Sequence, residues 1–122
     1  GETNLLEVDI KRVGEGVAQC QLPSGEILEA TFSRDLMSRS KGYISIRPEH
    51  IELCLVDKEA SFLGAVDREI YLGTDTQTLI RLNNGHTIIV RSQNTSENKG
   101  GFAHGDQVGM KINPGAAILL ID

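Results

Sequence analysis

The histidines and cysteines of this chain, the side chains with which zinc sites are most often built, are few and scattered. They are His50, His86 and His104, with two cysteines, Cys20 and Cys54. They do not form the repeated short spacings with which histidines and cysteines bind zinc. The sequence therefore predicts no metal site, and we expect both cysteines to be small core residues.

The chain also lacks the motifs of nucleotide hydrolysis and of acyl transfer. A P-loop requires a glycine-rich turn that ends in Gly-Lys-Ser or Gly-Lys-Thr, and no such string occurs. The Gly14-Glu15-Gly16 segment precedes an expected strand rather than a helix, so we interpret it as a turn. The sequence has no Gly-x-Ser-x-Gly elbow, the motif that would indicate a nucleophilic serine. We expect this chain not to be an enzyme, and we assign no catalytic residue and no cofactor to it.

Charge argues against nucleic acid as a partner. Twelve basic and seventeen acidic residues give a formal net charge of −5, which phosphate backbones repel. The one locally basic stretch has Arg34, Arg39, Lys41 and Arg47 against a single Asp35, and we interpret it as a solvated loop rather than a binding patch. Two thiols without a cleavable apolar leader favour a reducing compartment. The longest apolar run, residues 116–121, fits a buried strand and is far below the roughly 20 residues that span a bilayer.

The elements that must position any site are short strands, because no segment keeps a helical apolar period for three turns. Residues 78–91 predict a hairpin whose turn is Asn83-Asn84-Gly85, since Asn-Gly adopts the positive φ of tight turns. Residues 17–32 repeat this plan around Pro23-Ser24-Gly25, with alternating apolar and polar residues in the returning strand. The sequence therefore predicts an all-β fold.

The two halves of the chain follow the same pattern. A shift of 60 residues superimposes Leu22 on Leu82, Gly25 on Gly85, Leu28 on Ile88 and Ala30 on Val90. A shift of 66 superimposes Ile44 on Met110, Ile46 on Ile112, Pro48 on Pro114 and Leu53 on Leu119. We infer an internal duplication: two small barrel-like units, residues 1–57 and 58–122, packed so that each covers the other's apolar edge.

Four segments resemble, in the same order, the C-terminal regulatory domain of ABC importer ATPases. They are GETNLLEV (1–8), IRPEHI (46–51), FLGAVDREIYLGTDT (62–76) and HGDQVGMKINP (104–114). This is the transport-associated OB-like domain, or TOBE domain, and within the family the chain is similar to importers of polyamine or ferric-ion type. The resemblance implies two small OB-like β-barrel units packed into one compact regulatory domain of a longer ATPase.

The same resemblance implies function and partners. The chain would be a non-catalytic regulatory and dimerisation module of the ATP-binding subunit of a membrane-associated ABC transporter, while ATP and Mg would bind in an ATPase domain outside it. The partners would be a second copy, the parent ATPase domain and integral-membrane permease subunits, on the cytoplasmic side of the membrane. Two alternatives stay open: a small-ligand or oxyanion-sensing OB-like binding domain, and an OB-type nucleic-acid binder, which the net charge disfavours.

The family motif carries over to nine positions with a structural or interface role. They are Asn4, Arg47, Pro48, Glu49, Tyr71, Leu72, Gly73, Gly105 and Asp106. We expect Asn4 to cap or bond the returning chain, Pro48 to end a strand, and Gly73 and Gly105 to allow turns. The carry-over implies that Arg47 and Glu49 bond across the gap between units or to a neighbouring subunit, or form a local ion pair. The Ser-Ala-Arg-Asn segment of molybdate-binding relatives is replaced here by residues 59–62, which weakens the oxyanion alternative.

Overall fold

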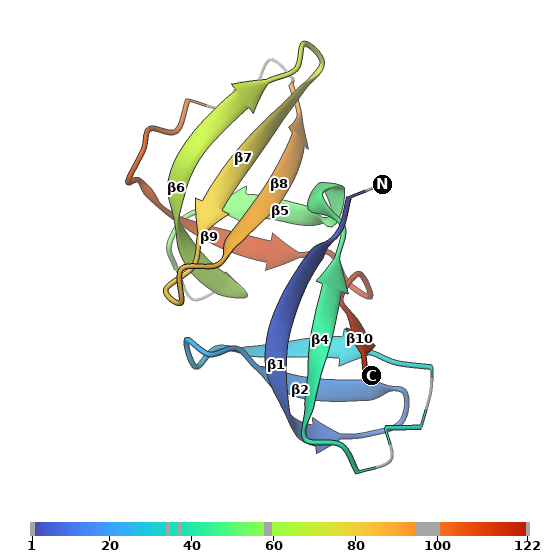
Figure 1. The fold of residues 1–122 in the computed structure, drawn as a ribbon. Coiled ribbons are helices and arrows are strands. Elements are labelled where there is room, and N and C mark those ends of the chain that lie inside the picture. Colours follow the sequence, from blue (N-terminus) through green and yellow to red (C-terminus); the bar gives the residue numbers. More distant parts are fainter. Residues whose placement is uncertain (1, 34, 37, 58–59, 95–100, 122) are drawn as a thin grey trace.

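The computed structural model describes residues 2–33, 35–36, 38–57, 60–94 and 101–121, and all its long elements are strands (Figure 1). The strands are β1 (Asn4–Val13), β2 (Val17–Gln21), β3 (Ile27–Thr31), β4 (Lys41–Ile46), β5 (Ile51–Cys54), β6 (Phe62–Tyr71), β7 (Asp75–Arg81), β8 (Thr87–Gln93), β9 (Gln107–Ile112) and β10 (Ile118–Leu120). One turn of 3₁₀-helix, η1 (Pro48–His50), precedes β5. The described residues contain no α-helix, so the all-β prediction is confirmed.

The strands form two sheets, in which β1, β2, β3, β4 and β10 of the first take the same relative places as β6, β7, β8, β9 and β5 of the second. The first is a closed barrel, β1-β2-β3-β10-β4, and the second is a five-stranded sheet, β5-β9-β6-β7-β8. The two ten-residue strands, β1 and β6, each carry a bulge, at Lys11 and at Asp67. At the bulge the register with the following strand, β2 or β7, shifts by one residue. Figure 1 shows β1 and β4 reaching from the barrel toward the second sheet, with η1 beside the start of β1.

Each sheet takes one strand from the other half of the chain. β5 pairs with β9, with Leu53 opposite Met110, and β10 pairs with β4, with Leu119 opposite Ile44. These two pairings are equivalent under the shift of 66. The division into units 1–57 and 58–122 stays a prediction about domains; in the sheets, one strand crosses that boundary in each direction.

The hairpins agree closely with the expected duplication. In the first, the N–H of Leu22 donates to the carbonyl of Glu26 at 2.9 Å, and in the second the N–H of Leu82 donates to the carbonyl of His86 at 2.8 Å. Both turns close with a glycine of positive φ, +102° at Gly25 and +85° at Gly85. The shift of 60 thus relates residues with the same backbone conformation and the same bonding.

The core is apolar and continuous between the sheets. Its largest fully buried apolar side chains are Phe62, Ile44, Ile46, Ile80, Ile88, Met110, Val66, Val90, Val108 and Cys20. In β6, β7 and β8 they alternate with exposed or half-buried residues, as a pleated strand with one buried face requires, whereas in β9 Gly109 between Val108 and Met110 is buried as well. Of the two cysteines, Cys20 is fully buried and Cys54 is half-buried.

Candidate functional site

Asn4 joins the barrel to the second sheet. Its side-chain amide donates from Nδ2 to the carbonyl of Ile89 at 2.8 Å, and its Oδ1 accepts the N–H of Ile89 at 2.9 Å. Ile89 lies in β8, an edge strand of the second sheet, and Asn4 is only 7% exposed. The buried amide therefore pairs with that edge as a residue of a neighbouring strand would.

The Arg47-Pro48-Glu49 motif forms the corner between β4 and β5. Pro48 is buried and begins η1, and the N–H of His50 donates to the carbonyl of Arg47 at 3.0 Å. β4 ends at Ile46, two residues before Pro48, and that the proline ends this strand stays a prediction. Arg47 and Glu49 are exposed, and within the described ranges their side chains make no hydrogen bond or ion pair; a role toward a partner stays a prediction.

Leu72 and Gly73 lie in the turn between β6 and β7, directly after Tyr71, the last residue of β6. Gly73 has φ of +91°, and its carbonyl accepts Nδ2 of Asn94 at 3.0 Å. The N–H of Asn94 also donates to the carbonyl of Thr74 at 2.7 Å, so Asn94 makes two hydrogen bonds to the backbone of this turn. The sequence did not single out this asparagine. Tyr71 is 74% exposed and Leu72 48%, so the turn presents two apolar side chains to solvent.

Gly105 and Asp106 fasten a turn to the bulge of β6. Gly105 has φ of +90° and donates its N–H to the carbonyl of Val66 at 2.7 Å. The carbonyl of Asp106 accepts the N–H of Val66 at 2.8 Å, and its carboxylate accepts the N–H of Ala103 at 2.9 Å. Both residues therefore have a structural role in the described chain.

The family-motif residues thus occupy separate places. Asn4 and the η1 corner lie together beside β8, while the β6–β7 turn and the Gly105-Asp106 turn lie elsewhere on the second sheet. Sequence reasoning missed Glu26, whose carboxylate accepts the N–H of Leu63 at 2.8 Å and so links the first hairpin to β6. A contact between residues so far apart in the chain leaves no signal in a single sequence.

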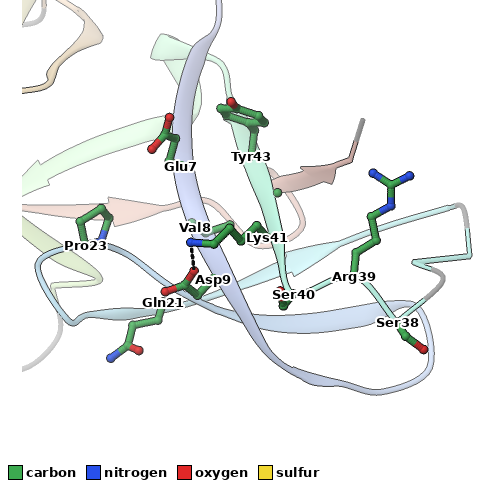
Figure 2. Close-up of a pocket in the computed structure, with 11 residues that line it drawn as sticks. Glu7, Val8, Asp9, Gln21, Pro23, Ser38, Arg39, Ser40, Lys41 and Tyr43 are labelled. Atoms are coloured by element: carbon green, nitrogen blue, oxygen red, sulfur yellow. Dashed lines mark hydrogen bonds and ion pairs between the residues drawn. The ribbon is translucent and has the colours of Figure 1, made fainter.

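A polar hollow of about 820 Å³ opens on the barrel between β1, β4 and the loop before β4 (Figure 2). Figure 2 shows Lys41 paired with Asp9, the distance between Nζ and Oδ1 being 3.3 Å. Glu7 and Tyr43 lie at one end of the hollow, and Ser38 and Arg39 on the loop. Its charged side chains, Glu7, Asp9, Arg39 and Lys41, balance in sign.

Beside this hollow lies an apolar patch that we call the outer face, made of Leu5, Tyr43, Ile118 and Leu120. Tyr43 on β4 stands opposite Leu120 on β10, while Ser45 stands opposite both Ile118 and Leu5. The four side chains are 36% to 46% exposed, so three adjacent strands share apolar outward residues. Exposed apolar side chains that gather on neighbouring strands in this way make the outer face a candidate interaction site.

The described part of the chain offers little to metal or acid–base chemistry. Its histidine, cysteine, aspartate and glutamate residues form no group of three or more that could hold a metal ion. Burial raises the pKa of the Cys20 thiol above its ordinary value. No helix within the described ranges is long and apolar enough to cross a membrane.

The chain is similar in sequence to import ATP-binding proteins and in fold to a molybdate-binding protein. The spermidine/putrescine import ATP-binding protein PotA of Mesorhizobium japonicum is 36% identical over all of this chain, and PotA 1 of Pseudomonas aeruginosa 30%. The chain spans about a third of the length of these relatives, 33% and 32%. The solved structure of the cytoplasmic molybdate-binding protein ModG superimposes with a TM-score of 0.79 at 15% identity, covering 98% of this chain and 96% of ModG, and shares the fold.

The family assignment rests on a match over most of the chain. The model of the TOBE domain family matches residues 44–120, which include η1, the β6–β7 turn and the Gly105-Asp106 turn. The match also covers both exchanged strands, β5 and β10. The chain therefore belongs to the TOBE domain family.

Proposed function

We propose that this chain is the regulatory and dimerisation module of the ATP-binding subunit of a polyamine ABC importer. Full-length relatives are named spermidine/putrescine import ATP-binding proteins, and this chain corresponds to a third of their length. Nucleotide binding and hydrolysis, with ATP and Mg, belong to an ATPase domain outside the chain. This division of labour fits a chain in which we find no catalytic motif.

The observation that carries the dimerisation part is the outer face. Tyr43 and Leu120 stand opposite each other on the barrel, with Leu5 and Ile118 next to them, and none of the four is buried. Covering apolar surface gains roughly 25 cal/mol per Å², so this face favours association. A second copy is the occupant we propose, because a twofold interface uses the same patch of both subunits.

The remaining partners follow from the relatives. Because those relatives are import ATP-binding proteins, we propose that this module belongs to a subunit that couples to membrane-crossing permease subunits, and that it lies on the cytoplasmic face through the parent transporter. Two exposed surfaces are available to such partners. One is formed by Tyr71 and Leu72 at the β6–β7 turn, and the other by Arg47 and Glu49 at the η1 corner.

Light scattering on the purified chain tests the dimerisation proposal. We expect a mass that rises toward twice 13.3 kDa with concentration. Tyr43→Glu and Leu120→Glu should keep the chain monomeric, because each places a charge at the centre of the face. Val13→Glu is the matched control, since Val13 is 51% exposed on β1 outside the outer face, and it should leave the mass unchanged. A wild-type mass of one chain at every concentration contradicts the proposal.

The hollow on the barrel supports a second candidate, in which the module senses a small polar ligand. Carboxylates at Glu7 and Asp9 suit an amine, whereas Arg39 and Lys41 suit an oxyanion. Calorimetry with spermidine, putrescine, sulfate and molybdate separates the two ligand classes. Heat that saturates for one class and disappears in the matching charge-removing variant, Glu7→Gln or Arg39→Gln, supports sensing. A flat titration with all four ligands at millimolar concentration contradicts it.

A further inference from the structure

The internal duplication places two equivalent strand edges in different surroundings. Ile89 in β8 corresponds to Glu29 in β3 under the shift of 60, because Ile89 stands opposite Leu79 and Glu29 opposite Gln19. The edge at Ile89 is covered by the amide of Asn4. The edge at Glu29 has no such cover within the described residues.

The backbone of β3 points outward at Glu29 and at Ile27. Residues opposite each other in an antiparallel pair alternate between bonded and non-bonded pairs. Leu22 and Glu26 form a bonded pair, so the pairs that include Ile27, Glu29 and Thr31 are non-bonded. The outward N–H of Thr31 indeed donates to the carbonyl of Ala117 at 2.9 Å. The N–H and carbonyl groups of Ile27 and Glu29 therefore face away from β2.

β10 covers only one end of this edge. It pairs with β3 at a single position, Ile118 opposite Thr31, and the chain before it turns at Gly115, where φ is +76°. The uncovered part opens into a hollow of about 400 Å³ whose lining includes Ile27, Glu29, Ile112 and Pro114. Of the lining residues only Glu29 bears a charge, and Ile27 is 49% exposed.

β6 leaves this hollow open because its chain turns away earlier than that of β1. The pair of Leu6 and Ile44 in the barrel corresponds to the pair of Phe62 and Met110 in the second sheet. β6 begins at Phe62, whereas β1 begins two residues before Leu6, at Asn4. Among the described residues, Ala60 corresponds to Asn4, since it stands two residues before Phe62 as Asn4 stands two residues before Leu6. Alanine has no side-chain amide, and Ala60 lies next to Gly109.

We propose that the β3 edge at Ile27 and Glu29 binds a short, extended, uncharged segment of a partner polypeptide by strand addition. Two residues separated by one along a strand present donors and acceptors at the spacing of a second strand, which is the pattern of β-augmentation. The Asn4–Ile89 pair is the intramolecular precedent for an amide on the equivalent edge. Ile112 and Pro114 supply an apolar wall for one side chain of the segment. This proposal is independent of the regulatory role.

Hydrogen exchange of the free chain gives the first test, with the two equivalent amides as an internal comparison. We expect the amide of Ile89, which donates to Asn4, to exchange at least tenfold more slowly than the amide of Glu29. Equal protection of both amides in dilute protein would overturn the proposal, because the β3 edge would already be covered.

A peptide titration followed by NMR gives the second test. The probe is acetyl-Thr-Val-Thr-N-methylamide, and its control is the same peptide N-methylated at valine, which lacks one donor. We expect saturable shifts of the Ile27 and Glu29 amides at millimolar probe and at least tenfold weaker binding of the control. Shifts of these amides on dilution of the Leu120→Glu variant without probe contradict the proposal, because the occupant would then be a second copy bound at β3 rather than at the outer face.

Two variants distinguish the backbone of Glu29 from its side chain. Glu29→Pro removes the outward N–H while the bonded pairs on either side, at Leu28 and Ala30, remain, so binding should weaken at least tenfold. Glu29→Ala keeps the N–H and should bind within twofold of wild type. Equal binding by all three proteins, or no saturable shift of either amide in the wild type, overturns the proposal. The N-methylated peptide tests the same bond if the proline variant fails to fold.

Discussion

Replacing Asn4 by alanine should destabilise the whole chain, because this side chain makes two hydrogen bonds between the sheets. Both bonds go to the backbone of Ile89, at 2.8 and 2.9 Å, and Asn4 is 7% exposed. A neutral hydrogen bond contributes about 1 kcal/mol, and a buried group left without its partner costs more. The loss should therefore be about 2 to 3 kcal/mol in the free energy of unfolding.

The corresponding change in melting temperature follows from the size of the chain. An unfolding entropy of about 2.1 cal/mol/K per residue, applied to 122 residues, converts 1 kcal/mol into roughly 4 °C. Differential scanning calorimetry of Asn4→Ala should therefore show a melting temperature lower by roughly 8 to 12 °C. Hydrogen exchange should become faster at the amide of Ile89, which loses its acceptor.

Asn113→Ala is the matched control for this prediction. Asn113 is exposed, and its side chain makes no hydrogen bond in the described part of the chain, so its removal should cost less than about 0.5 kcal/mol. A second variant, Asn4→Asp, keeps the acceptor but loses the donor, and places a carboxylate against the carbonyl of Ile89. It should be at least as unstable as Asn4→Ala at pH 7. If Asn4→Ala and Asn113→Ala melt within about 2 °C of each other, the reasoning about the buried amide is refuted.

Three other perturbations have defined outcomes. Gly64→Ala should lower the free energy of unfolding, measured by chemical denaturation, by about 1 to 3 kcal/mol, because the new methyl group would collide with Ile80. The control Gly14→Ala should lower it by less than about 1 kcal/mol, because its methyl group would stand 3.7 Å from its nearest neighbour. Because burial raises the pKa of the Cys20 thiol, the folded chain keeps this proton to higher pH than the unfolded chain. The stability of the folded chain is therefore unaffected by this thiol below the unfolded pKa of about 8.5 and declines above it. Cys20→Ala should flatten that decline when the melting temperature is measured against pH. Asn94→Ala should speed hydrogen exchange in the β6–β7 turn with little change in the global melting temperature, and unchanged exchange would contradict the role of that side chain.

The hairpins could be predicted because their signals are local. Gly25 and Gly85 mark turns that need a positive φ, and the alternation of buried and exposed residues in β3 fixes which face is inside. The strand exchange could not be predicted, because β5 and β10 are short apolar strands that suit either sheet. In the structure β5 follows the η1 corner and pairs with β9, and β10 follows the turn at Gly115 and pairs with β4.

The site could be predicted only in part. Asn4 was expected to bond the returning chain, but nothing in its neighbourhood indicates β8, 85 positions away, as its partner. Glu26 and Asn94 were missed for the same reason: each bonds backbone groups that only the fold brings near. Pro48, Gly73 and Gly105 were predictable, since backbone geometry alone explains them.

The central claim, a regulatory and dimerisation module of an import ATPase, is tested most directly on a full-length ATP-binding subunit that contains this domain. The measurement is subunit mass by analytical ultracentrifugation with ATP hydrolysis in the same samples, for wild type, Leu120→Glu and the control Val13→Glu. We predict that Leu120→Glu alone shifts the subunit toward monomer and changes its ATP hydrolysis at least threefold. Unchanged mass and hydrolysis in a folded Leu120→Glu subunit would contradict the account.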